Sequence, residues 1–424
     1  MYDAKQKATK VTMNSAYGFA GVANNGKQPC LPLASAVTTI GRQLIEKTKA
    51  FCESHVPGSE VIYGDTDSVM WNVWPDRPVD SSTVKDAFQI AADTAKAIAP
   101  IYEHDGNSFV VLEFENVYVN YLLIRKKIYC TLQYSADLGW EKPKKTVKKG
   151  LKCVRRDTIE FARKSQLDVV EHVANNRIEL AIEIGKNAVT ELFGGNVPLK
   201  QLMTSKKVSS RYKVSAERTN GQKVKVKVTP HGKWQAEEDE TMQGTCEVLP
   251  GKPWKMFDAQ GNLFGELTLA QPHVHVMHKM EQRAPNSGPR VGERVRYVFV
   301  TPDSSSGAAE LQIARAEEPE YASLNNMLPD AVYYFEHCLR SPLETILEIF
   351  VDDPYSALGW RVAHVEAQNK SEKQKSLADY GFSLKAASKK KSRVASRPVA
   401  KRKKMEQLVE INKKGMSHFF AKKQ

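Results

Sequence analysis

The stretch VIYGDTDSVM, residues 61–70, places two aspartates, Asp65 and Asp67, one residue apart between two runs of strand-forming residues. The flanking β-branched and aromatic residues predict two strands, and the polar residues between them are typical of a tight turn, to which we expect Gly64 to contribute. Two carboxylates at a strand end repel each other unless a cation lies beside them. The stretch therefore predicts a hairpin whose tip is either a solvated turn or a site for a hard cation such as Mg²⁺.

The composition favours an ordinary globular protein. A chain of 424 residues, 41% of them hydrophobic, is long enough for two to four domains of about 150 residues each. No apolar run approaches the roughly 18 residues of a membrane span, so no membrane partner is expected. The six cysteines are scattered and form no CxxC pair, which predicts reduced thiols in an intracellular protein rather than a zinc module or a disulfide framework.

The net charge of +13 is concentrated at the C-terminal end. Residues 385–424 hold 14 Lys and Arg against only Glu406 and Glu410. This basic, low-complexity tail is predicted to be disordered. A second basic cluster, KPKKTVKKGLKCVRR at residues 142–156, has eight Lys and Arg and no acid; its charge density suits either a nucleic-acid backbone or a solvated loop.

Periodicity predicts a mixed α+β fold. An Asn-Gly turn followed by alternating valines indicates a small β insertion at about 213–269. On the first helix, Gln6, Lys10, Asn14 and Tyr17 share one face, which by itself could be an ordinary solvated stripe. The remaining expected elements are helices at 2–17 (ending at Gly18), 35–52, 83–103, 157–193, near 274 and at 330–350, and strands at 109–119 and 121–134.

Several stretches together resemble the family B DNA polymerases, most closely the delta-like branch of eukaryotes and large DNA viruses. KVTMNSAYG (10–18) is similar to the family motif KxxxNSxYG, YGDTDS (63–68) to YxDTDS, and KKIYC (126–130) to KKRY. KGLKCVRRD (149–157), LEFENVYVNYLL (112–123), RVGERVRYVFV (290–300) and LPDAVYYFEHCLRSPL (328–343) extend the resemblance in the family order. One such agreement could be chance, but all of them in order could not.

The resemblance implies DNA-directed DNA synthesis from deoxynucleoside triphosphates, with a two-metal Mg²⁺ site. Asp67 would be the principal metal ligand beside Asp65, with Glu113 and Glu115 either accessory ligands or a plain surface pair. Lys10, Asn14 and Tyr17 would contact the incoming nucleotide. Primer-template contacts would come from Lys126, Lys127, Tyr129, Lys149, Arg155 and Arg156, with Ile128 replacing the arginine common in that motif.

The resemblance also implies a domain layout, with partial helical fingers, a palm with an antiparallel sheet, and a largely helical thumb. We expect partial fingers helices at 1–56, a palm at 57–148, a thumb at 149–384 that includes the β insertion, and the tail at 385–424. The family's DxxSLYPS-like segment, which carries another metal-binding aspartate, is not found. We therefore expect a C-terminal portion that needs an N-terminal polymerase part as partner; the alternative is a non-catalytic fragment that binds DNA and a sliding clamp. RNA-templated synthesis fits the motifs less well.

Two further stretches carry separate hypotheses. Near the C-terminus, Met416, Phe419 and Phe420 reproduce the spacing of a sliding-clamp peptide, although Lys413 stands where glutamine is usual. The basic residues upstream could be a nuclear-import signal or a DNA-tethering arm, so the nucleus or a viral replication compartment is the expected location. His273, His275 and His278 are expected to be structural rather than metal ligands.

Overall fold

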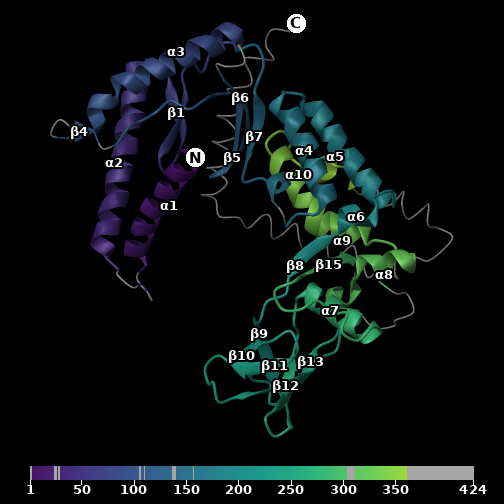
Figure 1. Cartoon of the computed structure of the whole chain (residues 1–424). Helices are drawn as coiled ribbons and strands as arrows, with labels where there is room; N and C mark the ends of the chain where they lie inside the picture. Colours follow the sequence, from purple (N-terminus) through teal and green to yellow (C-terminus); the bar gives the residue numbers. More distant parts are fainter. Residues whose placement is uncertain are drawn as a thin grey trace. The chain divides into compact units, whose positions relative to one another are not determined.

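The chain folds into two compact units, one running to Val147 and the other beginning at Lys148. The computed structural model (Figure 1) describes residues 2–22, 26, 29–104, 107–108, 110–135, 140–155, 157–302 and 311–360. The basic tail and the clamp-like residues Met416, Phe419 and Phe420 lie outside these ranges, as does Arg156. Helices and strands are both abundant, so the predicted α+β class holds at that level.

The first unit opens with two long helices, α1 (Tyr2–Gly21) and α2 (Leu31–His55). Gly18 was expected to end the first helix, but α1 continues to Gly21, because one glycine weakens a helix without stopping it. Pro32 stands in the first turn of α2, where its missing N–H costs nothing. Large apolar side chains on these helices are exposed, including Met13 at 69%, Phe19 at 61% and Ile40 at 55%.

A hairpin and a capped helix follow. Strands β1 (Glu60–Asp65) and β2 (Ser68–Asn72) pair antiparallel in a two-stranded sheet. Helix α3 (Ser81–Ala97) begins after Asp80, whose side chain accepts a hydrogen bond from the Thr83 N–H at 2.7 Å, the usual chemistry of an N-cap. The short elements that come next are a 3₁₀ turn (Ala99–Tyr102), β3 (Glu103–His104) and β4 (Asn107–Ser108).

A three-stranded sheet in the order β5-β6-β7 completes this part of the chain. Its strands are β5 (Val117–Arg125), β6 (Ile128–Tyr134) and β7 (Lys145–Lys149). Leu122, Leu132 and Cys130 are buried in it, and the Thr131 hydroxyl donates to the Val119 carbonyl at 2.9 Å. The strand predicted at 109–119 is wrong in its first part, because residues 110–116 form no strand and pairing starts at Val117.

The second unit has a helical core. Helices α4 and α5 bury Val169, Val170, Val189 and Leu192, and Phe335, Leu343 and Ile346 are buried in a later helical segment. The helices of this core are α4 (Glu160–Ala174), α5 (Ile178–Phe193), α6 (Leu199–Leu202), α9 (Ala331–Tyr334), a π-helical turn (Phe335–Leu339), α10 (Arg340–Leu347) and α11 (Pro354–Ala357). A 3₁₀ turn (Lys152–Val154) precedes them.

The predicted β insertion is present and is a closed six-stranded antiparallel barrel. Val226, Val228, Trp234, Trp254 and Met256 fill its core. A Cβ on Gly265 would lie 2.1 Å from the Glu217 carbonyl oxygen on the paired strand, so closure requires a glycine there. The strands are β9 (Tyr212–Arg218), β10 (Lys223–Val228), β11 (Lys233–Ala236), β12 (Gln243–Glu247), β13 (Trp254–Asp258) and β14 (Leu263–Leu267).

Helix α7 (Pro272–Arg283) follows the barrel and precedes a three-stranded sheet in the order β16-β15-β8. That sheet comprises β8 (Thr204–Lys207), β15 (Arg294–Phe299) and β16 (Ala316–Glu317); a 3₁₀ turn (Gln312–Arg315) precedes β16, and α8 (Pro319–Leu324) follows it. All six cysteines are free thiols. Among the described residues, no helix combines the length and apolarity needed to span a membrane.

Candidate active site

The two aspartates of the opening stretch lie at the tip of the β1–β2 hairpin. Asp65 pairs with Ser68 in the strand register, and Thr66 and Asp67 form the turn. The left-handed backbone that this turn requires is supplied by Thr66, with φ of 58°, and not by Gly64, which belongs to β1. Thr66 and Asp67 are exposed, and the Asp67 N–H donates to the Asp65 carbonyl at 2.7 Å. A β-branched residue in this conformation is strained by about 1–2 kcal/mol, which is a common mark of a functional turn.

A lysine from the β5–β6 hairpin lies against Asp65. The Lys127 Nζ is 3.1 Å from the Asp65 Oδ1, and the Thr66 hydroxyl donates to the same oxygen at 3.1 Å. The hydrogen bond from Lys127 lowers the pKa of Asp65, and the Thr66 hydroxyl and the nearby charge of Lys126 act in the same direction. Asp65 is therefore a carboxylate that already attracts a cation.

The backbone of Lys127 explains how it reaches the aspartate. Lys127 lies in the turn between β5 and β6 with φ of 64°, and its N–H donates to the Tyr63 hydroxyl at 2.9 Å. Tyr63 is two residues before Asp65 on the other hairpin. The two hairpin tips are thus joined by one main-chain hydrogen bond and one ion pair, both formed by the same residue.

A cluster of tyrosines lies beside the carboxylates. The ring centroids of Tyr121 and Tyr129 are 5.0 Å apart in a stacked arrangement, and those of Tyr63 and Tyr129 are 6.4 Å apart. Burial, followed by the nearby ionisable groups Tyr118, Tyr63, Asp65 and Glu115, raises the pKa of Tyr129. Among the described residues, the buried hydroxyl of Tyr121 has no hydrogen-bond partner. The cluster is an aromatic surface whose charge-sensitive members Tyr121 and Tyr129 lie near enough to Asp65 for its charge to raise their pKa.

The acids Glu113 and Glu115 are both exposed and alternate with partly buried neighbours. The sequence predicted a strand here, but both acids lie in the irregular segment before β5. Glu115 is close enough to raise the pKa of Tyr118, after the larger effect of burial. Since Asp65 and Glu115 both act on Tyr129, the two carboxylates border the same aromatic cluster.

The helix residues Lys10, Asn14 and Tyr17 are all exposed on α1. Their spacing places them on one face, as predicted from the sequence. No hydrogen bond or ion pair within the described ranges joins any of the three side chains to Asp65 or Asp67. The structure therefore presents this face to solvent and leaves the nucleotide-binding prediction untested.

The basic residues of the predicted DNA contact divide between the two units. In the first unit Lys126 and Lys127 are exposed, whereas the Tyr129 ring is buried. In the second unit Lys149 is exposed, and Arg155 forms two hydrogen bonds to Asp157 at 2.9 and 2.7 Å. Two side chains that sequence reasoning missed are Tyr63, as a partner of Lys127, and Tyr121; only the local tyrosine spacing could have suggested them.

The two aspartates suit part of a Mg²⁺ coordination sphere. Mg²⁺ is usually bound by one or two carboxylates together with water and substrate phosphates. Asp67 is exposed at the tip, and Asp65 already pairs with the Lys127 ammonium. Within the described residues, no group of three or more His, Cys, Asp or Glu side chains could hold a metal ion. The fit is therefore to a site that draws its remaining ligands from substrate, water or further polypeptide.

The motif order and this hairpin geometry agree with a comparison against protein-family models. Residues 1–239 and 266–350 match the model described as DNA polymerase family B. The chain belongs to DNA polymerase family B. The unmatched stretch between the two matched ranges, residues 240–265, holds β12, β13 and part of β14 of the barrel, so part of the barrel falls outside the family pattern.

Curated family B relatives agree with this assignment. The chain is 30% identical over 358 residues to a DNA polymerase of Paramecium bursaria Chlorella virus NY2A, a match covering 84% of this chain and 32% of the viral protein. DNA polymerase delta catalytic subunits of Oryza sativa subsp. japonica (30%, covering 82% of this chain and 26% of the relative) and Plasmodium falciparum (29%, covering 83% and 26%) are also similar. The chain thus spans about a third or less of the length of these relatives.

Proposed function

We propose that this chain carries part of the catalytic site of a DNA-directed DNA polymerase and transfers nucleotides from dNTPs to a primer 3′-OH. The observation that carries the proposal is the strained hairpin tip with Asp65 and Asp67, joined to the Lys127 turn, in a chain of family B. Residues 1–56 would form part of the fingers, 57–148 the palm and 149–384 the thumb.

Asp67, the exposed carboxylate, would bind the cation most directly, with Asp65 beside it. Bound Mg²⁺ would stabilise the attacking and leaving oxygens of phosphoryl transfer. Lys127 would hold Asp65 in place until a nucleotide and primer arrive. Glu115 is the better candidate for an accessory ligand, because it and Asp65 both act on the pKa of Tyr129. Glu113, two residues earlier, is the second candidate.

Lys10 and Asn14 would bind the incoming triphosphate and Tyr17 would lie under the new base pair; all three are exposed and accessible on α1. The primer-template backbone would be positioned, without its sequence being read, by Lys126, Lys127, Tyr129, Lys149, Arg155 and Arg156. Arg155 would then have to exchange Asp157 for a phosphate, an exchange of one charge-assisted hydrogen-bond partner for another.

Further polypeptide from a family B polymerase is a proposed partner of the first unit. Monomeric soluble proteins rarely leave large contiguous apolar surface uncovered, and α1 and α2 expose Met13, Phe19, Leu33 and Ile40. A two-stranded sheet such as β1–β2 is marginal by itself. An added strand and an added helix would cover both features and could bring the further acidic ligand.

A second candidate is a non-catalytic fragment that binds DNA and a sliding clamp. It is favoured by the Lys127–Asp65 ion pair, which partly neutralises one of the two carboxylates. Met416, Phe419 and Phe420 would form the clamp contact, and the location would be the nucleus or a viral replication compartment. Calorimetry of the C-terminal peptide against the clamp tests this contact, and an absence of measurable heat counts against it.

Primer extension by the purified chain with Mg²⁺ tests catalysis. Asp67→Asn should reduce extension at least about a hundredfold, because the principal charge opposite the metal is lost. The matched control is Asp76→Asn, which removes an exposed aspartate from the loop after β2 and should change little. The assay is repeated after adding a polypeptide from the part of the related viral polymerase that precedes the matched region. If the chain binds duplex DNA but extends no primer in either assay, the non-catalytic candidate is favoured. An RNA template should support no synthesis.

A further inference from the structure

The barrel presents one face built from β9 and β10. On β10, Val226 and Val228 are buried, and Lys223 and Lys225 are exposed, with Lys227 partly so. Side chains alternate between the two faces of a strand, so the three lysines all lie on the outside. We call the outer surface of β9 and β10 the lysine face.

The strand register adds a fourth lysine. Lys213 of β9 lies opposite Lys227, and Ser215 lies opposite Lys225. Successive lysines on β10 are about 6.8 Å apart along the strand. Adjacent phosphates of one DNA strand rise by about 3.4 Å along the helix axis and also wind around it, so their separation is larger than that rise and similar to the spacing of these lysines. The lysine face therefore suits adjacent phosphates of a duplex.

Two acids belong to or border this face: Glu217 of β9 lies opposite Lys223, and Glu237 follows β11. Against the four lysines they leave an excess of positive charge. Lys213 pairs with Glu237 at 2.8 Å, and that hydrogen bond, with the charges of Lys227 and Lys225, lowers the pKa of Glu237. In the following turn the Asp239 carboxylate accepts hydrogen bonds from Thr241. Within the described ranges, Lys223, Lys225 and Lys227 form no ion pair, so their ammonium groups are available to an anion.

The barrel is held firmly to the helix that follows it. The His275 Nδ1 accepts from the Gly251 N–H at 2.9 Å, and its Nε2 donates to the Leu269 carbonyl at 2.6 Å. The His278 Nε2 donates to the Pro230 carbonyl at 2.7 Å. These bonds join α7 to the loop after β10, to the loop between β12 and β13 and to the segment after β14. The barrel is therefore held to α7 by more than the two segments of chain that enter and leave it.

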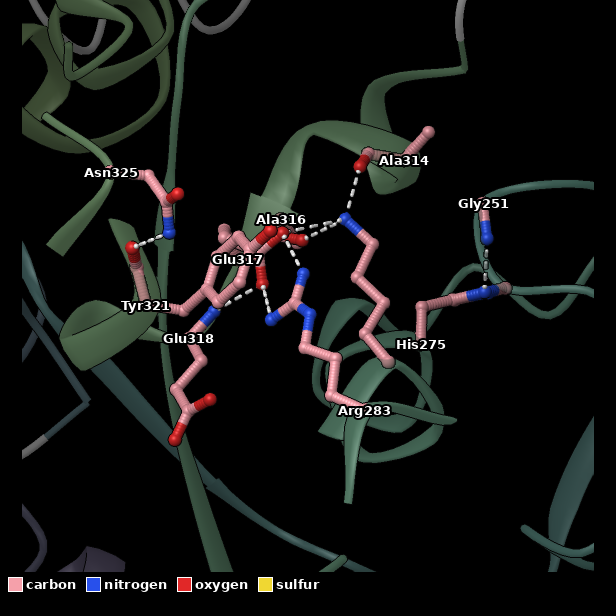
Figure 2. Close-up of polar contacts among 10 residues, drawn as sticks. Gly251, His275, Arg283, Ala314, Ala316, Glu317, Glu318, Tyr321 and Asn325 are labelled. Atoms are coloured by element: carbon pink, nitrogen blue, oxygen red, sulfur yellow. Dashed lines mark hydrogen bonds and ion pairs between the residues drawn. The ribbon is translucent and has the colours of Figure 1, made fainter. Parts of the chain in front are cut away.

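The other end of α7 is fixed to the rest of the second unit, as Figure 2 shows. Lys279 donates to the carbonyls of Ala314 at 2.7 Å and Ala316 at 2.8 Å. Arg283 makes two hydrogen bonds of 2.9 Å to the buried Glu317. The Arg283 guanidinium also lies 3.3 Å from the Tyr321 ring centroid. The lysine face is consequently held in a fixed orientation within its unit, which lowers the entropy that binding costs.

We propose that the lysine face is a DNA-binding surface of the barrel, which contacts the phosphate backbone of duplex DNA without reading its sequence. Its identity as a DNA surface rests on the proposed function. The chemistry is that of charge neutralisation and counterion release by lysine. It is distinct from the hairpin-tip residues. Its strands β9 and β10 lie within the residues that match the family model, whereas β12 and β13 of the same barrel do not.

The test measures binding of a fluorescein-labelled DNA duplex to the full chain by anisotropy over a series of salt concentrations. The variant Lys225→Gln/Lys227→Gln removes two charges from the lysine face. Each lost phosphate contact should lower the slope of log K against log[salt] by about 1, so the double variant should lose about 2. The variant Lys225→Arg/Lys227→Arg should keep the parent slope.

The matched control is Lys252→Gln/Lys255→Gln, which removes two exposed lysines at and before β13, on the side of the barrel away from β10. Its slope should equal that of the parent. Equal losses in both glutamine variants, no loss in either, or no duplex binding by the parent would overturn the proposal. The chain has six tryptophans, of which Trp234 and Trp254 are buried in the barrel; an intrinsic fluorescence spectrum equal to that of the parent checks that the barrel of each variant is folded. If the slope falls in the glutamine variant but the parent does not extend primers, the lysine face is supported and the catalytic proposal is contradicted. If the parent extends primers but the slope does not change, the catalytic proposal is supported and the lysine face is contradicted.

Discussion

The Lys127 ammonium lies 3.1 Å from the Asp65 carboxylate, and the same residue donates its backbone N–H to Tyr63. One residue of the β5–β6 turn therefore fixes both the charge and the position of the β1–β2 hairpin. The positive charge of Lys127 offsets the repulsion between Asp65 and Asp67, which are separated by one residue. This arrangement explains how two adjacent acids are tolerated before any divalent ion binds.

Replacing this lysine should change the titration of Asp65. In Lys127→Ala the hydrogen bond to the carboxylate is lost, so the pKa of Asp65 should rise toward its ordinary value. Carbon-13 NMR of labelled aspartate carboxyl groups through a pH titration measures this directly. The control is Lys126→Ala, which removes the neighbouring charge but no hydrogen bond, and it should move the pKa less. Equal shifts in the two variants would mean that the contact is not specific.

Thr66 offers a test of strain in the turn. Thr66→Asn should stabilise the hairpin by about 1 kcal/mol, because asparagine adopts positive φ more readily than a β-branched residue. Thr66→Val keeps the branched side chain and its strain but removes the hydroxyl that donates to Asp65. Hydrogen exchange of the Asp67 amide reports the local opening free energy. Slower exchange is expected only in the asparagine variant, and slower exchange in both would refute the strain argument.

Two glycines of the barrel allow a test of the contact between the barrel and Ala314. Gly251 and Gly261 both have positive φ, of 78° and 84°. A Cβ at Gly251 would lie 2.6 Å from the Ala314 Cβ, whereas at Gly261 it would meet nothing within 4 Å. Gly261→Ala should therefore cost about 1 kcal/mol of backbone strain, and Gly251→Ala about 1–3 kcal/mol more from the overlap. Urea unfolding followed by tryptophan fluorescence compares them; equal losses would show that the Ala314 contact is loose.

The fold was predictable where local pattern decides it. The long helices and the valine alternation of β10 follow from periodicity, and the Asn-Gly turn at 220–221 marked the connection between β9 and β10. Barrel closure was not predictable, because the pairing of β9 with β14 joins distant residues and depends on a close backbone approach at Gly265. The segment 110–116 has strand-like residues but forms no strand, and the pairing of β5 with β6 starts at Val117.

The candidate site, like the fold, was predictable from the sequence only in part. Asp65 and Asp67 could be located from their spacing, and the resemblance assigned them a role. The contacts of Lys127 with Asp65 and Tyr63 could not be foreseen, because they depend on how two separate hairpins approach. The expectation that Gly64 contributes to the turn was wrong, because the strand register pairs Gly64 with Val69 and leaves Thr66 and Asp67 as the two turn residues.

The histidines that join α7 to the barrel predict a pH dependence of stability. His273 is 2% exposed, and its burial, together with the charge of Lys206 and His275, lowers its pKa from 6.5 to about 4. A buried neutral histidine contributes stability that is complete above the unfolded pKa and is lost as the pH falls toward the folded pKa. The second unit should therefore lose roughly 3 kcal/mol from this residue between pH 6.5 and about pH 4.

His275 and His278 act in the same direction, because burial also lowers the pKa of each. Urea unfolding at neutral pH and near pH 4, followed by the fluorescence of Trp234 and Trp254, measures the combined loss. In His273→Gln the free energy of unfolding should be lower at neutral pH but should fall less steeply with acid, because one neutral histidine no longer has to take up a proton. A pH dependence as steep as that of the parent would show that His273 does not carry the effect.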